Sequence, residues 1–183
     1  MSDPDGALAG VPDGFQRLWT PHRMAYIGGE NKPADEQAGD GCPFCRAASL
    51  SDEDGLVIGR STLTYALLNL YPYNSGHVLV CPYRHVADFT DLTEQEAAEI
   101  GATTRRVMRA LRAAYTPQGF NLGINVGEVA GAGIAGHLHQ HVVPRWRGDS
   151  NFLPIVARTR ALPELLADTR ARLSAAWTEV DAC

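Results

Sequence analysis

The sequence predicts an α+β fold, in which an antiparallel sheet packs against helices. Two kinds of pattern lead to this prediction. Short apolar or alternating segments typical of strands recur along the chain, and two of them are joined by a turn of Pro, Asn, Ser and Gly, which favours antiparallel pairing. Other segments repeat apolar residues at helical spacing. The predicted strands are 56–59, 63–70, 77–82, 119–126 and 137–143, and the predicted helices are 93–115 and 162–177.

The helix at 93–115 is predicted by its first turns as well as by its apolar stripe. Thr93 and Glu96 have the spacing of a capping box, in which each side chain accepts a hydrogen bond from the other's backbone N–H. Acidic residues fill the first turn and arginines the later turns, which complements the helix dipole. The second helix, 162–177, carries Pro163 in its first turn, where proline is tolerated.

Composition excludes some classes of partner. Of the 183 residues, 45% are hydrophobic and 20% are charged, and the net charge is −5 without any basic run. Because binding to long nucleic acid depends on phosphate neutralisation by Lys and Arg, we expect no such partner, although a local basic pocket for a small phosphate ester fits. Neither a signal peptide nor a membrane span is visible, which predicts a cytoplasmic protein without a membrane partner. The four cysteines are then expected as reduced thiols or metal ligands.

The predicted elements belong to one domain, which we expect at 15–183. A leader at 1–14, rich in Asp, Gly, Pro and Ala, is predicted to be disordered. Aromatic residues between 15 and 26 predict an N-terminal arm that packs on the body, and a polar loop follows at 28–41. The helix at 162–177 is expected as a C-terminal extension of the same domain.

Three of the six histidines, His137, His139 and His141, fall at every second position. On a strand they project from one face about 6.5–7 Å apart. Two chemical uses fit such a row: a His-x-His pair can present nitrogen ligands to zinc, or one imidazole can attack phosphorus while its neighbours fix its tautomer. Histidines without a chemical role are the remaining interpretation. The row alone leaves these alternatives open.

Two further motifs are each ambiguous when taken alone. The loop at 127–136 has four glycines in ten residues, so its backbone N–H groups could converge on a phosphate, or the loop could simply connect two strands. Its position directly before the histidine row favours the phosphate interpretation. Cys42 and Cys45 form a single Cys-x-x-Cys, which fits half of a zinc site, a redox pair or coincidence. A zinc site would need histidines from elsewhere to complete it.

Two stretches together resemble the histidine triad family. Residues 137–143 are similar to its signature His-x-His-x-His followed by apolar positions, and residues 69–82 are similar to a second one, with Asn, a Pro-containing turn, Gly-His, an apolar strand and Pro. The resemblance covers about 42–148 in the family's order. It implies a five-stranded antiparallel sheet backed by helices, here a long helix and an additional C-terminal one. It also implies a homodimer that binds a purine nucleotide, and a tetramer of paired dimers stays open.

The resemblance also implies roles for individual residues. His139, the central histidine, would attack the α-phosphorus and form a covalent nucleotidyl-histidine, while His141 and His77 would orient the imidazole and hydrogen-bond the phosphate. This chemistry agrees with general principles, because a neutral imidazole is a nucleophile at pH 7 and its neighbours can offset phosphoryl charge without a metal. The matching residues are Asn69 at the ribose, Phe44, Leu67 and Leu70 at the base, and Asn125 near the phosphates. Gly131 and Gly133 of the glycine-rich loop and His137 complete the predicted substrate-binding set.

No cofactor is therefore required for the chemistry, but the resemblance implies a structural zinc. Some bacterial members bind one through a Cys pair, the His of a Pro-x-x-His element and the first triad histidine, and Cys42, Cys45, His85 and His137 match that set. A zinc metallohydrolase would instead use the metal in catalysis. Loss of rate on chelation would distinguish it, whereas a structural zinc predicts loss of stability first.

Residues 18–24, 145–152 and the added C-terminal helix resemble an actinobacterial branch of the family that cleaves diadenosine tetraphosphate with inorganic phosphate, yielding ATP and ADP. Hydrolases of the family commonly carry Gln or Ser just before the triad, where this loop has Ala132, Gly133 and Ile134. We therefore expect a nucleotidyltransferase whose partners are an adenine nucleotide and phosphate. The alternatives are a hydrolase of dinucleoside polyphosphates or adenosine phosphoramidates and, in a different class, a nucleotide-binding regulatory protein.

Overall fold

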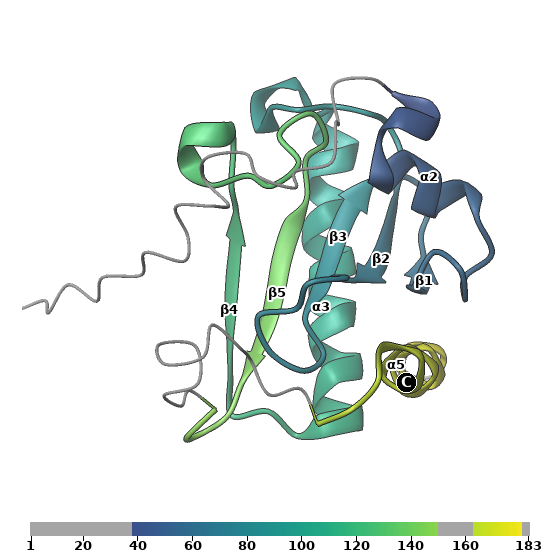
Figure 1. Cartoon of the computed structure of the whole chain (residues 1–183), viewed down its shortest axis with the longest axis vertical. Coiled ribbons are helices and arrows are strands. Elements are labelled where there is room, and N and C mark those ends of the chain that lie inside the picture. The colour runs from purple at the N-terminus through teal and green to yellow at the C-terminus, as the bar shows by residue number, and fades with distance from the viewer. Residues whose placement is uncertain (1–37, 150–162, 181–183) are drawn as a thin grey trace, which may run out of the picture.

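A five-stranded sheet forms the centre of the molecule, and the computed structural model describes it with its helices over residues 38–149 and 163–180. The strands run in the order β1-β2-β3-β5-β4, with every neighbouring pair antiparallel. Figure 1 shows the long helix α3 running behind this sheet. The predicted α+β class is confirmed. The elements are β1 Val57–Arg60, β2 Thr64–Leu68, β3 Val78–Pro82, β4 Gly119–Ile124, β5 Gln140–Arg145, α2 Pro43–Ser49, α3 Glu94–Tyr115 and α5 Leu166–Glu179.

Strands β2 and β3 are buried on both faces of the sheet, and side chains alternate between two apolar clusters. The larger cluster lies toward α3 and α5 and takes Ala66, Val80 and Val142 from three neighbouring strands. The smaller cluster lies on the other face, and its buried members are Cys42, Phe44, Val57, Tyr65, Leu67, Leu79 and Cys81. The second face is therefore the one on which α2 packs. It is also the face of the histidines.

Helix α3 confirms the prediction made from its first turn. Thr93 caps the helix by accepting from the Glu96 backbone N–H at 3.2 Å, and Glu96 Oε2 accepts from the Thr93 backbone N–H at 2.8 Å. Glu96 also accepts from Arg84 Nη2 at 2.6 Å. Helix α3 is thereby tied to the segment after β3 that carries His85. The helix ends at Thr116, which adopts a left-handed conformation with φ of 47°.

Helix α5 packs on α3 and β1, at the lower end of the molecule in Figure 1. Trp177 is the centre of this contact: the Arg106 guanidinium lies 3.7 Å from its ring centroid. On its other side lies Gly59 of β1, where an added Cβ would fall 2.1 Å from the indole ring. The helix begins at Leu166, later than predicted, and Pro163 therefore precedes it instead of occupying its first turn. Residue 162 lies outside the described residues.

The strand predicted at 137–143 begins only at Gln140, so the prediction was wrong for its first three residues. The physical reason is that the backbone before Gln140 bonds outside the ladder. Leu138 N donates to Val86 O at 2.7 Å, and the His137 carbonyl accepts from the side chain of His139 at 2.8 Å. The alternation of side chains nevertheless persists, with Leu138 in the larger cluster.

The predicted leader at 1–14 and arm at 15–26 lie outside the described residues, as does Cys183. Within the described part of the chain, no helix combines the length and the apolar character that crossing a membrane requires.

Candidate active site

Neighbouring strands β3 and β5 bring His77 and His141 together. His77 directly precedes β3, and His141 pairs with Leu79 across the two strands. His77 Nε2 lies 3.0 Å from His141 Nδ1, and their ring centroids are 5.2 Å apart. His139 lies on the other side of His141, at a centroid distance of 5.1 Å. The three histidines expected to share the chemistry therefore form one continuous group.

The hydrogen bonds around His77 define the tautomers of the pair. The Tyr73 backbone N–H lies 3.0 Å from His77 Nδ1 and can only donate, so Nδ1 is an acceptor and the proton of the neutral ring is on Nε2. That proton is donated to His141 Nδ1. The neutral His141 ring then carries its own proton on Nε2. Burial, with a smaller contribution from His139, lowers the pKa of His141 to about 4, so this neutral form is the one present at pH 7.

The surroundings of His139 suit a nucleophile. Its ring is buried, with 5% of its surface exposed. Its Nδ1 lies 2.8 Å from the His137 carbonyl oxygen, which can only accept, so Nδ1 carries the proton and the lone pair is on Nε2. The Phe44 ring packs against it at a centroid distance of 4.8 Å. His139 Nε2 thus carries a lone pair suited to nucleophilic attack, and His141 Nε2 carries a proton that it can donate.

The residues predicted to hold the nucleoside do not all lie in one place. Phe44 and Leu67 lie together in the smaller cluster, 6% and 5% exposed. Asn69 lies beside His77, with its amide nitrogen 3.4 Å from His77 Nδ1. Leu70 is not part of this buried group, because 59% of its surface is exposed on the turn after β2.

The glycine-rich loop leads directly into the triad. Its backbone takes positive φ angles at Gly127 and Gly131, 81° and 89°, which glycine adopts without strain. Asn125 ties the loop to the end of β4, because its amide nitrogen donates to the Gly131 carbonyl at 3.4 Å. Gly133 lies partly buried in the same loop. Asn125, Gly131 and Gly133, all predicted to bind substrate, thus lie on one connection between β4 and the histidines.

Four predicted metal ligands also converge. The ligand atoms of Cys42, Cys45, His85 and His137 all lie within 4.8 Å of one another. Nδ1 of His137 is 3.4 Å from Cys42 Sγ and 3.5 Å from Cys45 Sγ, and Nδ1 of His85 is 3.4 Å from Cys45 Sγ. In tetrahedral zinc sites, bonds of about 2.3 Å to sulfur and about 2.0–2.1 Å to nitrogen place such pairs about 3.5 Å apart. The four side chains fit Zn²⁺.

The surroundings of these ligands support the same assignment. His137 Nε2 donates to the Pro82 carbonyl at 2.9 Å, which leaves the Nδ1 lone pair facing the thiols, as the ring nitrogen of a zinc ligand should. Burial raises the pKa of the Cys42 thiol, so a bound cation is what would favour the thiolate. Both ring nitrogens of His137 are engaged in this cluster. The structure thus associates His137 with the metal ligands, although it was also predicted near the substrate.

Sequence reasoning missed two groups at this site. Tyr73 packs its ring against His77 at 4.8 Å and His141 at 5.6 Å between centroids, in addition to donating its backbone N–H. The Pro82 carbonyl sets the orientation of His137. Tyr73 lies in the Pro-containing turn between two predicted strands, and its proximity to a predicted catalytic histidine was the available signal. For the Pro82 carbonyl the sequence offers no such signal, because every residue has a backbone carbonyl.

Comparison with known proteins agrees with this geometry. The family model described as the HIT domain, the domain of the histidine triad proteins, matches residues 51–148. The chain belongs to the HIT family. Among members of the family, an AP-4-A phosphorylase of Mycobacterium tuberculosis is 47% identical over 170 residues, which are 92% of this chain and 87% of that protein. A bifunctional bis(5'-adenosyl)-triphosphatase/adenylylsulfatase of Arabidopsis thaliana is 40% identical over 93 residues, 51% of each chain.

Solved structures of HIT proteins have the same fold. A zinc-bound histidine triad family protein from Mycobacterium smegmatis superposes with a TM-score of 0.61 at 29% identity, covering 77% of this chain and 96% of that one. A histidine triad nucleotide-binding protein from Sulfolobus tokodaii superposes with a TM-score of 0.63 at 25% identity, covering 76% and 94%. The first of these binds the metal that the cysteine and histidine cluster fits.

Proposed function

We propose that this HIT protein is a nucleotidyltransferase that cleaves diadenosine tetraphosphate by phosphorolysis to ATP and ADP, through a covalent nucleotidyl-histidine on His139. The observation that carries the proposal is the His139 lone pair on Nε2, which the Nδ1 hydrogen bond to the His137 carbonyl directs. The extensive similarity to an AP-4-A phosphorylase supports the substrate and the acceptor.

In the first step, His139 Nε2 attacks the α-phosphorus of one adenosine. The N–P bond forms, the bridging P–O bond breaks, and the other product leaves as ATP. The ring becomes cationic while Nδ1 keeps its proton and its bond to the His137 carbonyl. His141 Nε2–H donates to a phosphoryl oxygen and offsets the charge that develops there. Removal of one such donor typically lowers the rate of an enzyme by about 10²–10³-fold. His77 holds the His141 proton on the nitrogen that does this.

In the second step, an oxygen of inorganic phosphate attacks the same phosphorus, the N–P bond breaks, and ADP is released. His139 recovers its lone pair. The segment 127–136 is a binding site for the acceptor phosphate in this proposal. It directly precedes His137, and its backbone N–H groups can bind phosphate oxygens. Asn125 would hold that segment in place through the Gly131 carbonyl. With Ala132, Gly133 and Ile134, the loop lacks the Gln or Ser side chains common in hydrolases.

Zinc is proposed here as a structural metal on Cys42, Cys45, His85 and His137. With four protein ligands the site is closed, and the bound ion would supply folding free energy and would not activate water. Three of the zinc ligands are close in sequence to residues of the catalytic site. Phe44 lies between the two cysteines, and His137 provides the carbonyl that orients His139. The cluster would thereby fix Phe44 and the nucleophile relative to each other.

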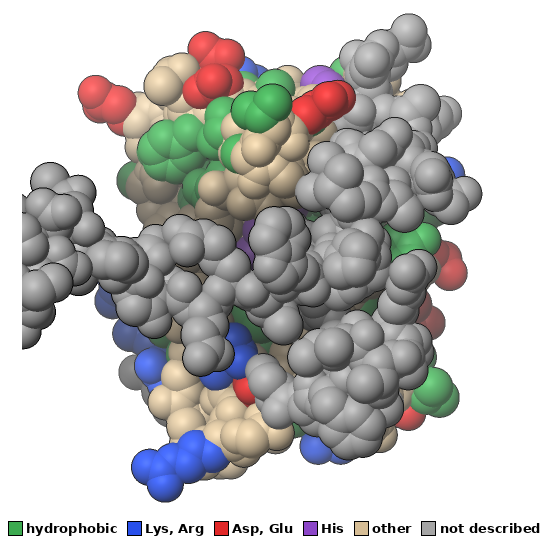
Figure 2. Space-filling view, turned by 60° about the vertical axis from the view of Figure 1, so that its left-hand side comes forward, with side chains coloured by type: hydrophobic (Ala, Val, Ile, Leu, Met, Phe, Trp, Pro, Cys, Tyr) green, Lys and Arg blue, Asp and Glu red, His purple; other side chains and the backbone are tan. Residues whose placement is uncertain are grey.

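The protein would act as a homodimer through strand β4. In the described part of the chain β4 pairs only with β5, so its other edge is open for a second copy. Leu122, Val126 and Val129 are exposed on it and on the loop that follows, at 49%, 38% and 104%. Figure 2 shows apolar side chains gathering on this side of the molecule. Pairing of two β4 edges would cover them.

Product analysis tests the proposal. The protein is incubated with diadenosine tetraphosphate with and without inorganic phosphate, and the nucleotides are separated. Phosphate-dependent ATP plus ADP is the expected result. AMP plus ATP, unaffected by phosphate, would refute phosphorolysis and assign the hydrolase. Absence of turnover with nucleotide binding retained would instead favour a regulatory role.

A further inference from the structure

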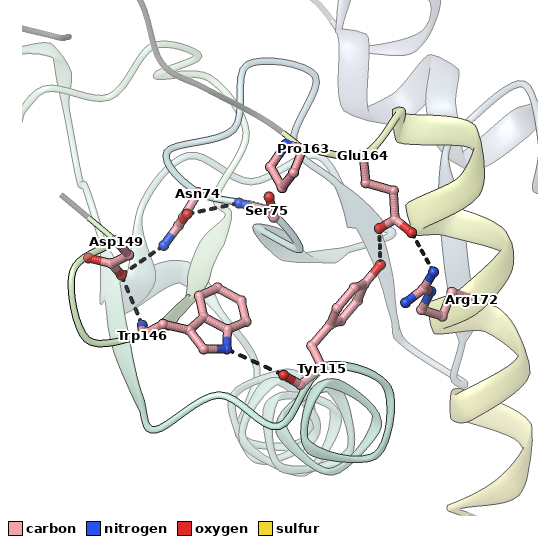
Figure 3. Close-up of a pocket in the computed structure, with 8 residues that line it drawn as sticks. All are labelled: Asn74, Ser75, Tyr115, Trp146, Asp149, Pro163, Glu164 and Arg172. Carbon is pink, nitrogen blue, oxygen red and sulfur yellow. Dashed lines mark hydrogen bonds and ion pairs between the residues drawn. The ribbon is translucent and has the colours of Figure 1, made fainter. Parts of the chain in front are cut away.

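Asn74 ties the turn before His77 to the C-terminal end of β5. Its amide nitrogen donates to the Pro144 carbonyl at 3.1 Å and to Asp149 Oδ2 at 2.9 Å (Figure 3). Its amide oxygen accepts from Ser75 N at 3.1 Å, and its backbone carbonyl accepts from His77 N at 3.2 Å. Every polar group of this side chain is therefore used to hold the turn in one place.

Asp149 gives this arrangement a rigid anchor. Only 9% of its side-chain surface is exposed. Arg145 binds both of its oxygens, Nε to Oδ2 at 2.6 Å and Nη2 to Oδ1 at 2.7 Å, and Trp146 N donates to Oδ2 at 3.0 Å. A carboxylate held by a bidentate arginine is a strong acceptor at a fixed position. Figure 3 shows how it faces Asn74 and Trp146 from the segment after β5.

The turn held in this way is the one that positions the Tyr73 backbone N–H against His77 Nδ1 at 3.0 Å. Tyr73 immediately precedes Asn74, so a shift of the turn moves this N–H directly. The Tyr73 ring moves with it, and it packs on both His77 and His141. The position of Asn74 is therefore transmitted to the nitrogen whose acceptor role fixes the tautomers of the pair.

The opposite tautomer would reverse the function of His141. If Tyr73 no longer donates to Nδ1, the longer contact from the Asn69 amide nitrogen, at 3.4 Å, holds the lone pair there more weakly. The His77 proton can then move to Nδ1, and Nε2 becomes an acceptor. His141 Nδ1 then donates to His77, and His141 Nε2 carries a lone pair where the phosphoryl oxygen needs a donor. The lone pair on His141 Nε2 and those of the phosphoryl oxygen would then repel each other. A small change at the turn would thereby raise the energy of the transition state.

We propose that Asn74 and Asp149 are positioning residues for nucleotidyl transfer, which fix the turn that sets the His77 tautomer and through it the proton on His141 Nε2. The inference rests on the proposed function, because it assigns His141 the role of donor to the phosphoryl group. The Asn74 side chain bonds to Pro144, Asp149 and Ser75, so the two residues act on the histidines through the backbone of the turn.

The test compares Asn74→Ala and Asp149→Ala with the parent protein in single-turnover cleavage of diadenosine tetraphosphate. Each variant is expected to lower the rate of nucleotidyl transfer about 10- to 100-fold, less than removal of a whole donor, while KM changes little. Because both residues act on one turn, the double variant should be no slower than the slower single variant. Asp149→Asn keeps an oxygen that can accept from Asn74 but places an NH2 group against an Arg145 donor, so it should restore part of the rate.

Glu164→Ala provides the matched control. Glu164 lines the same pocket as Asn74 and Asp149 (Figure 3), but it binds Tyr115 of α3 and Thr169 and Arg172 of α5, so its loss removes a network of similar size whose hydrogen bonds go to these two helices. It should cost stability. It should leave the transfer rate within about twofold, because its hydrogen-bond partners lie in α3 and α5 and not in the turn that donates to His77. Circular dichroism at the assay temperature checks that all variants are folded.

Proton-nitrogen NMR correlation of the histidine rings provides a readout that needs no turnover. The parent should show the His77 proton on Nε2, and Asn74→Ala should show a mixture of tautomers or the Nδ1 form. Unchanged His77 tautomers in both alanine variants, or transfer rates equal to that of Glu164→Ala, would overturn the inference. If the parent itself failed to cleave the substrate, the proposed function would fail, and the tautomer comparison would still decide the positioning role.

Discussion

The ion pair between Glu96 and Arg84 makes the stability of this protein depend on pH in a defined way. The Arg84 guanidinium, followed by the Thr93 backbone N–H, lowers the pKa of Glu96 to about 2 from its ordinary 4.5. A carboxyl whose pKa is lower in the folded state stabilises the fold above its unfolded pKa. That stabilisation is lost as the pH falls through the folded value. The relevant window therefore runs from about pH 5 down to about pH 2.

The magnitude follows from the shift. Each pKa unit corresponds to about 1.4 kcal/mol, so the full shift sets an upper limit of about 3 kcal/mol. The Arg84 side chain is 46% exposed, and solvent screens the pair, which reduces the expected contribution to about 1–2 kcal/mol. Glu96→Gln isolates this term, because glutamine keeps the oxygen that accepts from Thr93 N in the capping box.

Urea denaturation of the parent and of Glu96→Gln, followed by circular dichroism between pH 7 and pH 2.5, measures the difference. We expect the parent to be more stable by about 1–2 kcal/mol at pH 7 and the difference to shrink steadily below pH 5. Protonation of the zinc ligands occurs in both proteins and cancels from the comparison. A difference that is absent at pH 7, or constant over the whole range, would refute this reasoning.

Three further predictions concern other parts of the molecule. Removal of zinc by a chelator should lower the melting temperature, and turnover should fall only as the protein unfolds; a fall in rate at unchanged melting temperature would contradict a structural metal. His141→Phe, which fills the ring space without a donor, should lower the rate of nucleotidyl transfer about 10²–10³-fold while nucleotide binding, followed by calorimetry, is retained; an unchanged rate would remove His141 from the chemistry. Gly59→Ala should cost about 1–3 kcal/mol in denaturation, because the new Cβ would meet the Trp177 ring at 2.1 Å; a cost near zero would show that α5 adjusts freely.

The sequence was sufficient to predict those parts of the fold that local patterns determine. Helix α3 was predicted nearly to the residue, because Thr93 and Glu96 mark its start and an apolar stripe follows. The predicted start of β5 was wrong, because alternation of side chains at every second residue indicates an extended chain whether or not that chain pairs with a neighbouring strand. Only the tertiary bond from Leu138 N to Val86 O shows that the ladder begins later. In α5, Pro163 looked like a first-turn residue, although the helix begins at Leu166.

For the site, the sequence predicted which residue types meet but not how their protons are arranged. Cys42, Cys45, His85 and His137 were matched to a zinc set by resemblance, and the structure brings their ligand atoms together. The tautomers could not be predicted, since they depend on a backbone N–H of Tyr73 and a backbone carbonyl of His137. Asn74 and Asp149 are far apart in sequence, and only folding brings them into contact.

Direct trapping of the intermediate tests the central claim that His139 carries the nucleotidyl group to phosphate. The protein is mixed with diadenosine tetraphosphate labelled in its α-phosphates, without inorganic phosphate, and then quenched and digested. We expect one equivalent of ATP and a base-stable, acid-labile adenylyl label on the peptide that contains His139, and added phosphate should convert this label to ADP. Label on another residue, or loss of the label as AMP at the same rate with and without phosphate, would contradict it.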